Sequence, residues 1–376
     1  MVPNGWKQTT LDKVLTIGGG KDYKHLEEGS IPVYGSGGYM LSVSDYLYDG
    51  ESVCIGRKGT IDKPIFLKGK FWTVDTLFYT HSFKDSEPYY IYQFFQTVPW
   101  RRLNEASGVP SLAKSIINKV KINLPPLPEQ RKIAKILSTW DKAIATTEKL
   151  IDASQQQKKA LMQQLLTGKK RLVNPETGKA FEGEWEEVPL SNWLVEFKEK
   201  SSAQDQHRVY TSSRSGLVPQ DEYFGNSRIS DRKNIGFHIL PPGHMTYRSR
   251  SDDGYFTFNL FKGNENGIIS HYYPVFTSKG SNDFFIALLE QYRNVFGKHS
   301  VGTSQKVLSF NALKAIRFFV PSTYEQQKIA SVLIAADKEI ELLQAKLAHL
   351  KDEKKALMQQ LLTGKRRVKV DENVAA

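Results

Sequence analysis

The chain has 376 residues, too many for one ordinary hydrophobic core, so its length predicts two or three domains. With 40% hydrophobic and 24% charged residues, its composition is that of a folded protein and argues against wholesale disorder. The formal net charge of +12 suits a nucleic-acid ligand, although an acidic protein partner or a solvated surface would give the same excess.

Cysteine content and hydropathy exclude further classes of protein. The single cysteine, Cys54, rules out an internal disulfide framework and a Cys-based zinc site, and it favours a reducing compartment. The first residues lack the charged start and apolar run of a signal peptide. No apolar run approaches the roughly 18 residues of a membrane span. We therefore expect a cytoplasmic protein that binds no membrane.

Residues 1–128 predict a first small α+β domain. The segment opens near Trp6 and closes with a strand that alternates basic and apolar residues before Pro125. Between these ends we expect strands at 31–34, 52–55 and 73–79 and a helix at 87–96.

Residues 129–168 predict one long helix, because the segment lacks proline and contains glycine only near its end, at Gly168. Its apolar residues step by heptads, which is typical of a helix that packs on another helix. The predicted contact seam consists of Ile133, Leu137, Trp140, Ile144, Ile151, Leu161 and Leu165.

Residues 169–184 form a polar, Lys- and Gly-containing linker, and residues 185–324 repeat the plan of the first domain. This second segment also opens near a tryptophan, Trp185, and closes with a strand before Pro321. We expect strands at 245–247 and 272–276 and a helix at 283–293.

Residues 325–364 predict a second long helix that duplicates the first, followed by a basic and polar tail at 365–376. The stretch KKALMQQLLTGK occurs at 158–169 and again at 354–365, an offset of 196 residues. At this offset, 129–172 and 325–368 share 22 identities in 44 positions without a gap, which indicates an internal duplication. The predicted seam is Ile329, Leu333, Ile340, Leu343, Leu347, Leu350, Leu357 and Leu361.

The connectivity sets how the two helices pair. Because a globular segment separates them, two helices that pack side by side must run antiparallel. We therefore predict an α+β chain with two globular domains separated by two long helices packed as an antiparallel coiled coil with a pseudo-twofold axis, a symmetry that suits duplex DNA. Lys158 and Lys354 interrupt the apolar seam, and we expect both side chains to extend to water.

This order of elements resembles the specificity subunit of Type I restriction–modification systems. The resemblance rests on the EQRKIAKIL…LLTGKKRL and EQQKIASVL…LLTGKRRV helices, and on IPVYGSGG at 31–38, IGRKGT at 55–60 and DTLF at 75–78. The second globular segment departs from the pattern, since it has no IGRKGT match and its nearest counterpart is MTYRSR at 245–250.

The resemblance implies a function. Each globular segment would be a target-recognition domain that reads one half of a split site on double-stranded DNA. The helices would set the spacing and dock two methyltransferase subunits, and restriction and translocation subunits would complete the assembly. The chain itself would catalyse nothing and hold no cofactor, while S-adenosylmethionine, ATP and Mg²⁺ would be bound by partner subunits.

Candidate DNA contacts lie where glycine or aromatic residues accompany cations, because glycine allows close backbone approach and cations meet phosphates or guanine edges. In an alternative interpretation these are ordinary turns with solvated charges, and the tyrosines belong to the core. The candidates are Ser36, Gly37, Tyr39, Arg57, Lys58, Gly59 and Thr60 in the first domain and Arg228, Arg232, Lys233, Tyr247, Arg248 and Arg250 in the second.

Two other functions remain open from the residues alone. A self-contained nuclease or methyltransferase would need an active site, but Pro125-Pro126 lacks the flanking residues of a methyltransferase motif and no convincing carboxylate cluster with lysine appears. The histidines are scattered, so we predict no metal site and no catalytic residue. A coiled-coil adaptor that binds only protein would show the same helices.

The charge is concentrated in the helical repeats. Residues 129–172 contain 10 Lys or Arg against 4 Asp or Glu, and residues 325–368 contain 9 against 6, so together they supply +9 of the net +12. Much of this excess lies in the GKKR and GKRR segments that end the helices. We expect DNA phosphates or partner subunits to bind there.

Overall fold

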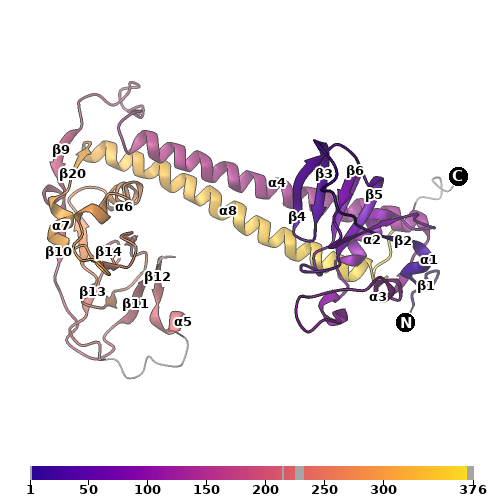
Figure 1. Cartoon of the computed structure of the whole chain (residues 1–376). Helices are drawn as coiled ribbons and strands as arrows, with labels where there is room; N and C mark the ends of the chain where they lie inside the picture. Colours follow the sequence, from indigo (N-terminus) through magenta and orange to yellow (C-terminus); the bar gives the residue numbers. More distant parts are fainter. Residues whose placement is uncertain (1, 214–215, 225–232, 371–376) are drawn as a thin grey trace. The chain divides into compact units, whose positions relative to one another are not determined.

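The computed structural model describes residues 2–213, 216–224 and 233–370. The chain divides into two compact units, unit 1 with residues 1–149 and 344–376 and unit 2 with residues 150–343. Two helices of 39 residues each, α4 (Leu127–Leu165) and α8 (Thr323–Leu361), run from one unit into the other (Figure 1). Each unit is therefore built from one globular segment and a part of both long helices.

Unit 1 is organised around a six-stranded sheet with the order β2-β7-β5-β6-β3-β4. Only β3 and β6 run parallel among these neighbours. The strands are β2 (Thr16–Gly19), β3 (Glu28–Gly35), β4 (Gly38–Val43), β5 (Tyr48–Gly56), β6 (Ile65–Thr73) and β7 (Leu77–His81), and the short helices are α1 (Leu11–Val14), α2 (Pro88–Phe95), α3 (Lys114–Asn118) and the 3-10 turn η1 (Trp100–Leu103).

A separate two-stranded sheet connects the globular part of unit 1 to its helices. In it, β1 (Lys7–Thr10) pairs antiparallel with β8 (Lys121–Leu124), and β8 leads directly into α4. The core beside this sheet joins Trp6 and Phe95 to Leu137 of α4 and Leu361 of α8. The start of α4 and the end of α8 are thus part of one hydrophobic core, whose burial stabilises both helix ends.

Unit 2 has smaller sheets. Two are four-stranded, with the orders β10-β18-β14-β16 and β12-β11-β17-β13, and two are pairs, β15-β19 and β9-β20. The strands are β9 (Glu186–Pro189), β10 (Leu194–Phe197), β11 (Arg208–Ser213), β12 (Gly216–Pro219), β13 (His238–Leu240), β14 (Met245–Tyr247), β15 (Arg250–Ser251), β16 (Phe258–Leu260), β17 (Gly267–Ile269), β18 (Val275–Ser278), β19 (Lys306–Val307) and β20 (Arg317–Val320). The short helices are α5 (Gln220–Phe224), α6 (Asn282–Gln291) and α7 (Phe310–Ala315), with 3-10 turns η2 (Leu190–Asn192) and η4 (Phe296–His299).

The β9-β20 pair of unit 2 repeats the β1-β8 pair of unit 1, and β20 leads into α8 as β8 leads into α4. The core of unit 2 packs Phe284 and Phe296 with Leu165 of α4 and Leu333 of α8. In unit 2, therefore, the end of α4 and the start of α8 complete one core.

The predicted α+β class with two long helices is confirmed. Both helices begin two residues earlier than predicted, at Leu127, directly after Pro126, and at Thr323, two residues after Pro321, so that Pro128 lies in the first turn of α4. The single strand predicted at 73–79 is wrong, because β6 ends at Thr73 and a turn, closed by a 2.9 Å hydrogen bond from Leu77 N to Val74 O, precedes β7. Likewise, of the strand predicted at 272–276 only the part from Val275 onward is extended into β18.

Two ion pairs within unit 1 show that the helices run antiparallel. In unit 1, Asp141 and Glu148 of α4 pair with Lys354 and Lys351 of α8, so the numbering rises on one helix as it falls on the other. Every residue predicted on the apolar seam is buried or half-buried.

The prediction that the two seam lysines extend to water is wrong. The Lys354 side chain is only 10% exposed, and its Nζ lies 2.6 Å from Asp141 Oδ1. Lys158 forms the equivalent ion pair with Asp337 in unit 2. Burial of a lysine in a seam requires a charged partner, and in each unit the opposite helix supplies one.

Candidate functional site

In unit 1 the candidate contacts gather around a loop that follows the buried strand β5. The backbone of this loop is fixed on both sides: Arg57 N donates to Thr76 O at 2.8 Å, and Leu112 N donates to Arg57 O at 2.9 Å. Its cationic side chains, Arg57 and Lys58, are exposed. The loop therefore presents two cations from a rigid backbone.

The turn between β3 and β4 lies against this loop. Gly59 has a φ of +85°, and a Cβ there would lie 3.2 Å from Ser36 Oγ, so the two turns approach closely. Gly37 is exposed beside Ser36, and Thr60 is half-buried. Tyr39 is 63% exposed, and its hydroxyl lies 3.2 Å from Ser42 Oγ. The structure thus joins the two predicted segments of the first domain in one region.

In unit 2 the corresponding feature is a cavity of about 580 Å³. Residues of β11, of α5, of the segment after β14, of the loop before β16 and of the segment before β18 surround it, namely Thr211, Ser212, Ser213, Tyr223, Arg248, Arg250, Ser251, Asp252, Tyr255, Thr257 and Tyr273. Arg248, Arg250 and Tyr255 are exposed. Hydroxyls, guanidinium groups and aromatic rings therefore meet in one open hollow, a combination suited to base edges and phosphates.

Arg250, one of the residues around this cavity, stacks on the ring of Tyr272. The Arg250 guanidinium lies 4.4 Å from the centre of the Tyr272 ring. The intervening backbone is held by Ser249, whose hydroxyl donates to Tyr272 O at 2.6 Å. The ring therefore limits the freedom of the Arg250 side chain.

The prediction of a DNA contact at Tyr247 is wrong. This side chain is completely buried, its hydroxyl donates to Leu308 O at 2.9 Å, and burial raises the pKa of the hydroxyl. The reason is its place on β14, which lies between β16 and β18 inside a sheet. Of the remaining candidates, Arg228 and Arg232 lie outside the described residues, and Lys233 is exposed.

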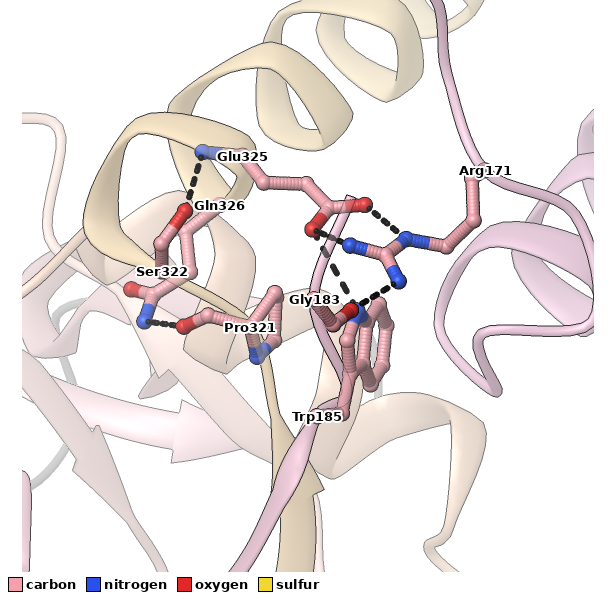
Figure 2. A network of polar contacts seen from close by, with 7 residues as sticks. All are labelled: Arg171, Gly183, Trp185, Pro321, Ser322, Glu325 and Gln326. Carbon is pink, nitrogen blue, oxygen red and sulfur yellow. Dashed lines mark hydrogen bonds and ion pairs between the residues drawn. The ribbon is translucent and has the colours of Figure 1, made fainter. Parts of the chain in front are cut away.

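A second feature is a polar network that joins the end of α4 to the start of α8 within unit 2 (Figure 2). The Glu325 carboxylate, 2% exposed, accepts two hydrogen bonds of 2.7 Å from the Arg171 guanidinium and one of 3.3 Å from Trp185 Nε1. Arg171 also donates to Gly183 O at 2.7 Å. The network thus fixes the linker, the first strand and the helix start together.

The same network occurs in unit 1, where its glutamate and arginine lie 196 positions from those of unit 2 and its tryptophan lies 179 positions away. Glu129 accepts two hydrogen bonds from Arg367, at 2.7 and 2.8 Å, and one of 3.2 Å from Trp6 Nε1. We call these two networks the clamps. The sequence revealed their tryptophans and glutamates as repeats, but it assigned the arginines to DNA or to partner subunits. In the structure, Arg171 and Arg367 bind inside the chain.

The seam ion pairs differ between the units. Asp141 accepts hydrogen bonds from Tyr89 at 2.9 Å and Gln93 at 2.7 Å in addition to its ion pair with Lys354. Burial, with the negative charge of Asp141, raises the pKa of the Tyr89 hydroxyl, which keeps it a donor. Asp337 in unit 2, at 48% exposed, pairs with Lys158. The ion pair of unit 1 thus has additional hydrogen-bond partners and a less exposed carboxylate than the ion pair of unit 2.

Within ranges 2–213, 216–224 and 233–370, no group of three His, Cys, Asp or Glu side chains is placed to hold a metal ion. No helix in these ranges is both long and apolar enough to cross a bilayer. Burial raises the pKa of the Cys54 thiol to about 12, which leaves it uncharged and unreactive.

Two regions of the chain, residues 3–154 and 200–352, match a family described as the Type I restriction modification DNA specificity domain. Over 358 residues the chain is 26% identical to the Type I restriction enzyme MjaVIII specificity subunit of Methanocaldococcus jannaschii, covering 86% of this chain and 79% of that protein. It is 28% identical to the putative type I restriction enzyme MjaX specificity subunit of the same organism, covering 88% and 80%.

Solved structures show the same fold. The crystal structure of a Type I restriction–modification system S subunit from M. genitalium matches with a TM-score of 0.64 at 14% identity, covering 96% of this chain and 97% of that one. A chain from a structure concerned with complex assembly and conformational transition of the type I restriction–modification system matches with a TM-score of 0.53 at 15% identity, covering 97% and 100%.

Proposed function

This chain belongs to the Type I restriction–modification DNA specificity family, and we propose that its two recognition domains each read one half of a split DNA target. It is the DNA sequence-specificity subunit of its system, not its enzyme. Its ligand is double-stranded DNA, and the other subunits of the restriction–modification system are its partners.

One observation supports a target of two parts. Unit 1 and unit 2 each contain a complete clamp and an exposed cationic segment. Each unit thus has its own support for a DNA-reading surface, so neither needs residues of the other to form one. We propose that Arg57, Lys58 and Gly59 contact DNA in unit 1 and that Arg248 and Arg250 do so in unit 2.

The long helices would set the distance between the two half-sites and dock two methyltransferase subunits, with restriction and translocase subunits completing the assembly. The antiparallel seam ion pairs support this role, because they fix the register of the two helices in each unit. S-adenosylmethionine, ATP and Mg²⁺ would be bound by the partners and not by this chain. Since DNA is the ligand, we place the complex in the cytoplasm.

The direct test is the modified DNA sequence in cells that carry the complete system. We expect two short specified segments separated by a gap of fixed length and free sequence. A single continuous motif would contradict the proposal. The absence of salt-sensitive binding to duplex DNA by the complex with its methyltransferase would favour a protein adaptor instead, because binding to phosphates weakens as salt rises.

The spacing role has a separate test, the deletion of one heptad from each helix near residues 147–153 and 341–347. At 1.5 Å per residue this shortens the helix pair by about 10 Å and leaves the apolar seam on nearly the same face of each helix. We expect the gap to shorten by about 3 base pairs, at 3.4 Å each, with both half-sites retained. Altered half-sites with an unchanged gap would contradict the role of the helices.

A further inference from the structure

The two units present a cation at the same place in their folds, and main-chain hydrogen bonds identify it. In unit 1, Arg57 N donates to Thr76 O at 2.8 Å and Arg57 O accepts from Leu112 N at 2.9 Å. In unit 2, Ser249 N donates to Tyr272 O at 3.4 Å and Ser249 O accepts from Leu308 N at 2.9 Å. Leu112 and Leu308 are 196 residues apart, the offset of the duplication. Arg57 and Ser249 are therefore structurally equivalent.

The next residue confirms this correspondence. Lys58 forms an antiparallel bridge with Ser111, and Arg250 pairs antiparallel with Val307. Ser111 and Val307 are again 196 residues apart. A letter-by-letter alignment of IGRKGT with MTYRSR would instead place Arg248 against Lys58. The structure thus assigns Arg250 as the counterpart of Lys58.

Both side chains are free to bind a ligand. Lys58 and Arg250 are exposed, and neither forms an ion pair with a carboxylate within the described part of the chain. Other exposed arginines of unit 2 are engaged, since Arg208 pairs with Asp221 and Glu222 and Arg317 pairs with Glu187. An exposed cation with no carboxylate partner is available to contact a base or a phosphate.

The two positions differ in how firmly the cation is held. Tyr272, whose ring lies 4.4 Å from the Arg250 guanidinium, stands where unit 1 has Thr76. Stacking on the ring face leaves the planar edge of the guanidinium, with its row of donors, directed at a ligand. That edge matches the O6 and N7 acceptors of guanine in the major groove. Lys58 carries a point charge with no such ring.

We propose that Lys58 and Arg250 are the equivalent base-contacting positions of the two recognition domains, and that Arg250 reads a guanine. Tyr272 is then a positioning residue that acts through Arg250. This inference rests on the proposed function and goes further, because it assigns one residue to each half-site.

The test determines the modified motif in cells with the complete system for Arg250→Lys, Arg250→Ala and Tyr272→Leu. We expect preference for one guanine in one half-site to fall about tenfold or more for both Arg250 variants, the scale of a lost bidentate contact. Tyr272→Leu should relax the same base by less. Lys58→Ala should change only the other half-site.

Lys262→Ala, which removes an exposed cation of unit 2 away from this cavity, serves as the matched control and should leave the motif unchanged. An unchanged motif in both Arg250 variants would overturn the inference, as would equal weakening at all sites with the base preference intact. If Arg250→Ala abolishes modification, the motif of Arg250→Lys decides whether the guanine preference is lost, because this variant retains the charge. A wild-type motif that is not split would instead refute the proposed function.

Discussion

At the scale of single residues, Tyr247 and Arg248 are neighbours with opposite roles. Tyr247 ends a strand inside a sheet, whereas Arg248 is the first residue past that strand and is exposed. Residue type and spacing suggested a contact at both, because arginine next to tyrosine is typical of nucleic-acid surfaces. Only the pairing of β14 with β16 and β18, which is not local in sequence, decides between core and surface.

Tyr247→Phe should therefore affect stability and not recognition. The substitution leaves Leu308 O without its hydrogen bond in the core, which costs about 1–2 kcal/mol in the free energy of unfolding. Denaturant unfolding of the purified chain measures this cost. A changed DNA motif in cells carrying the variant would contradict the buried role.

The seam carboxylates provide a matched pair for a second prediction. Asp141→Ala leaves the Lys354 ammonium, on a side chain that is 10% exposed, without its carboxylate, and it also removes the acceptor of Tyr89 and Gln93. We therefore expect the free energy of unfolding to fall by about 3 kcal/mol. Asp337→Ala removes a pair whose carboxylate is 48% exposed, so we expect about 1 kcal/mol or less. Hydrogen exchange of each unit measures both, and equal losses would contradict the difference.

At the scale of elements, the long helices were the most predictable part of the chain. Heptad spacing, flanking prolines and a duplicated sequence located them to within a few residues. The clamps were not predictable, because Arg171 and Glu325 are 154 residues apart and Arg367 and Glu129 are 238 apart. No local pattern connects such partners. The turn between β6 and β7 was missed for a related reason, since it contains neither glycine nor proline.

The clamps should stabilise each unit separately. Arg171→Met leaves the Glu325 carboxylate buried without its cation, so we expect about 3 kcal/mol less local stability in unit 2 and little change in unit 1. Arg367→Met should have the reverse pattern. Adding Glu325→Gln to Arg171→Met should restore part of the loss, because the buried charge is removed. Hydrogen exchange that rises equally in both units would contradict separate clamps.

At the scale of the whole molecule, the helical repeats carry most of the basic excess. They supply +9 of the net +12, and the ion pairs of Arg171, Arg367, Lys158 and Lys354 leave this sum unchanged, because the acidic partners belong to the same repeats. These four cations are engaged within the chain, so the excess lies on other residues of the repeats. We propose that specificity depends on a few exposed cations at fixed positions of each recognition domain.

The most direct test of the central claim is an exchange of recognition domains. Residues 186–322 would be replaced by the corresponding segment of a relative with another specificity, with α4, α8 and both clamps retained. Sequencing of modified DNA in cells with the complete system then reports the target. We expect one half-site to change while the other half-site and the gap stay the same. A change in both half-sites, or in neither, would contradict it.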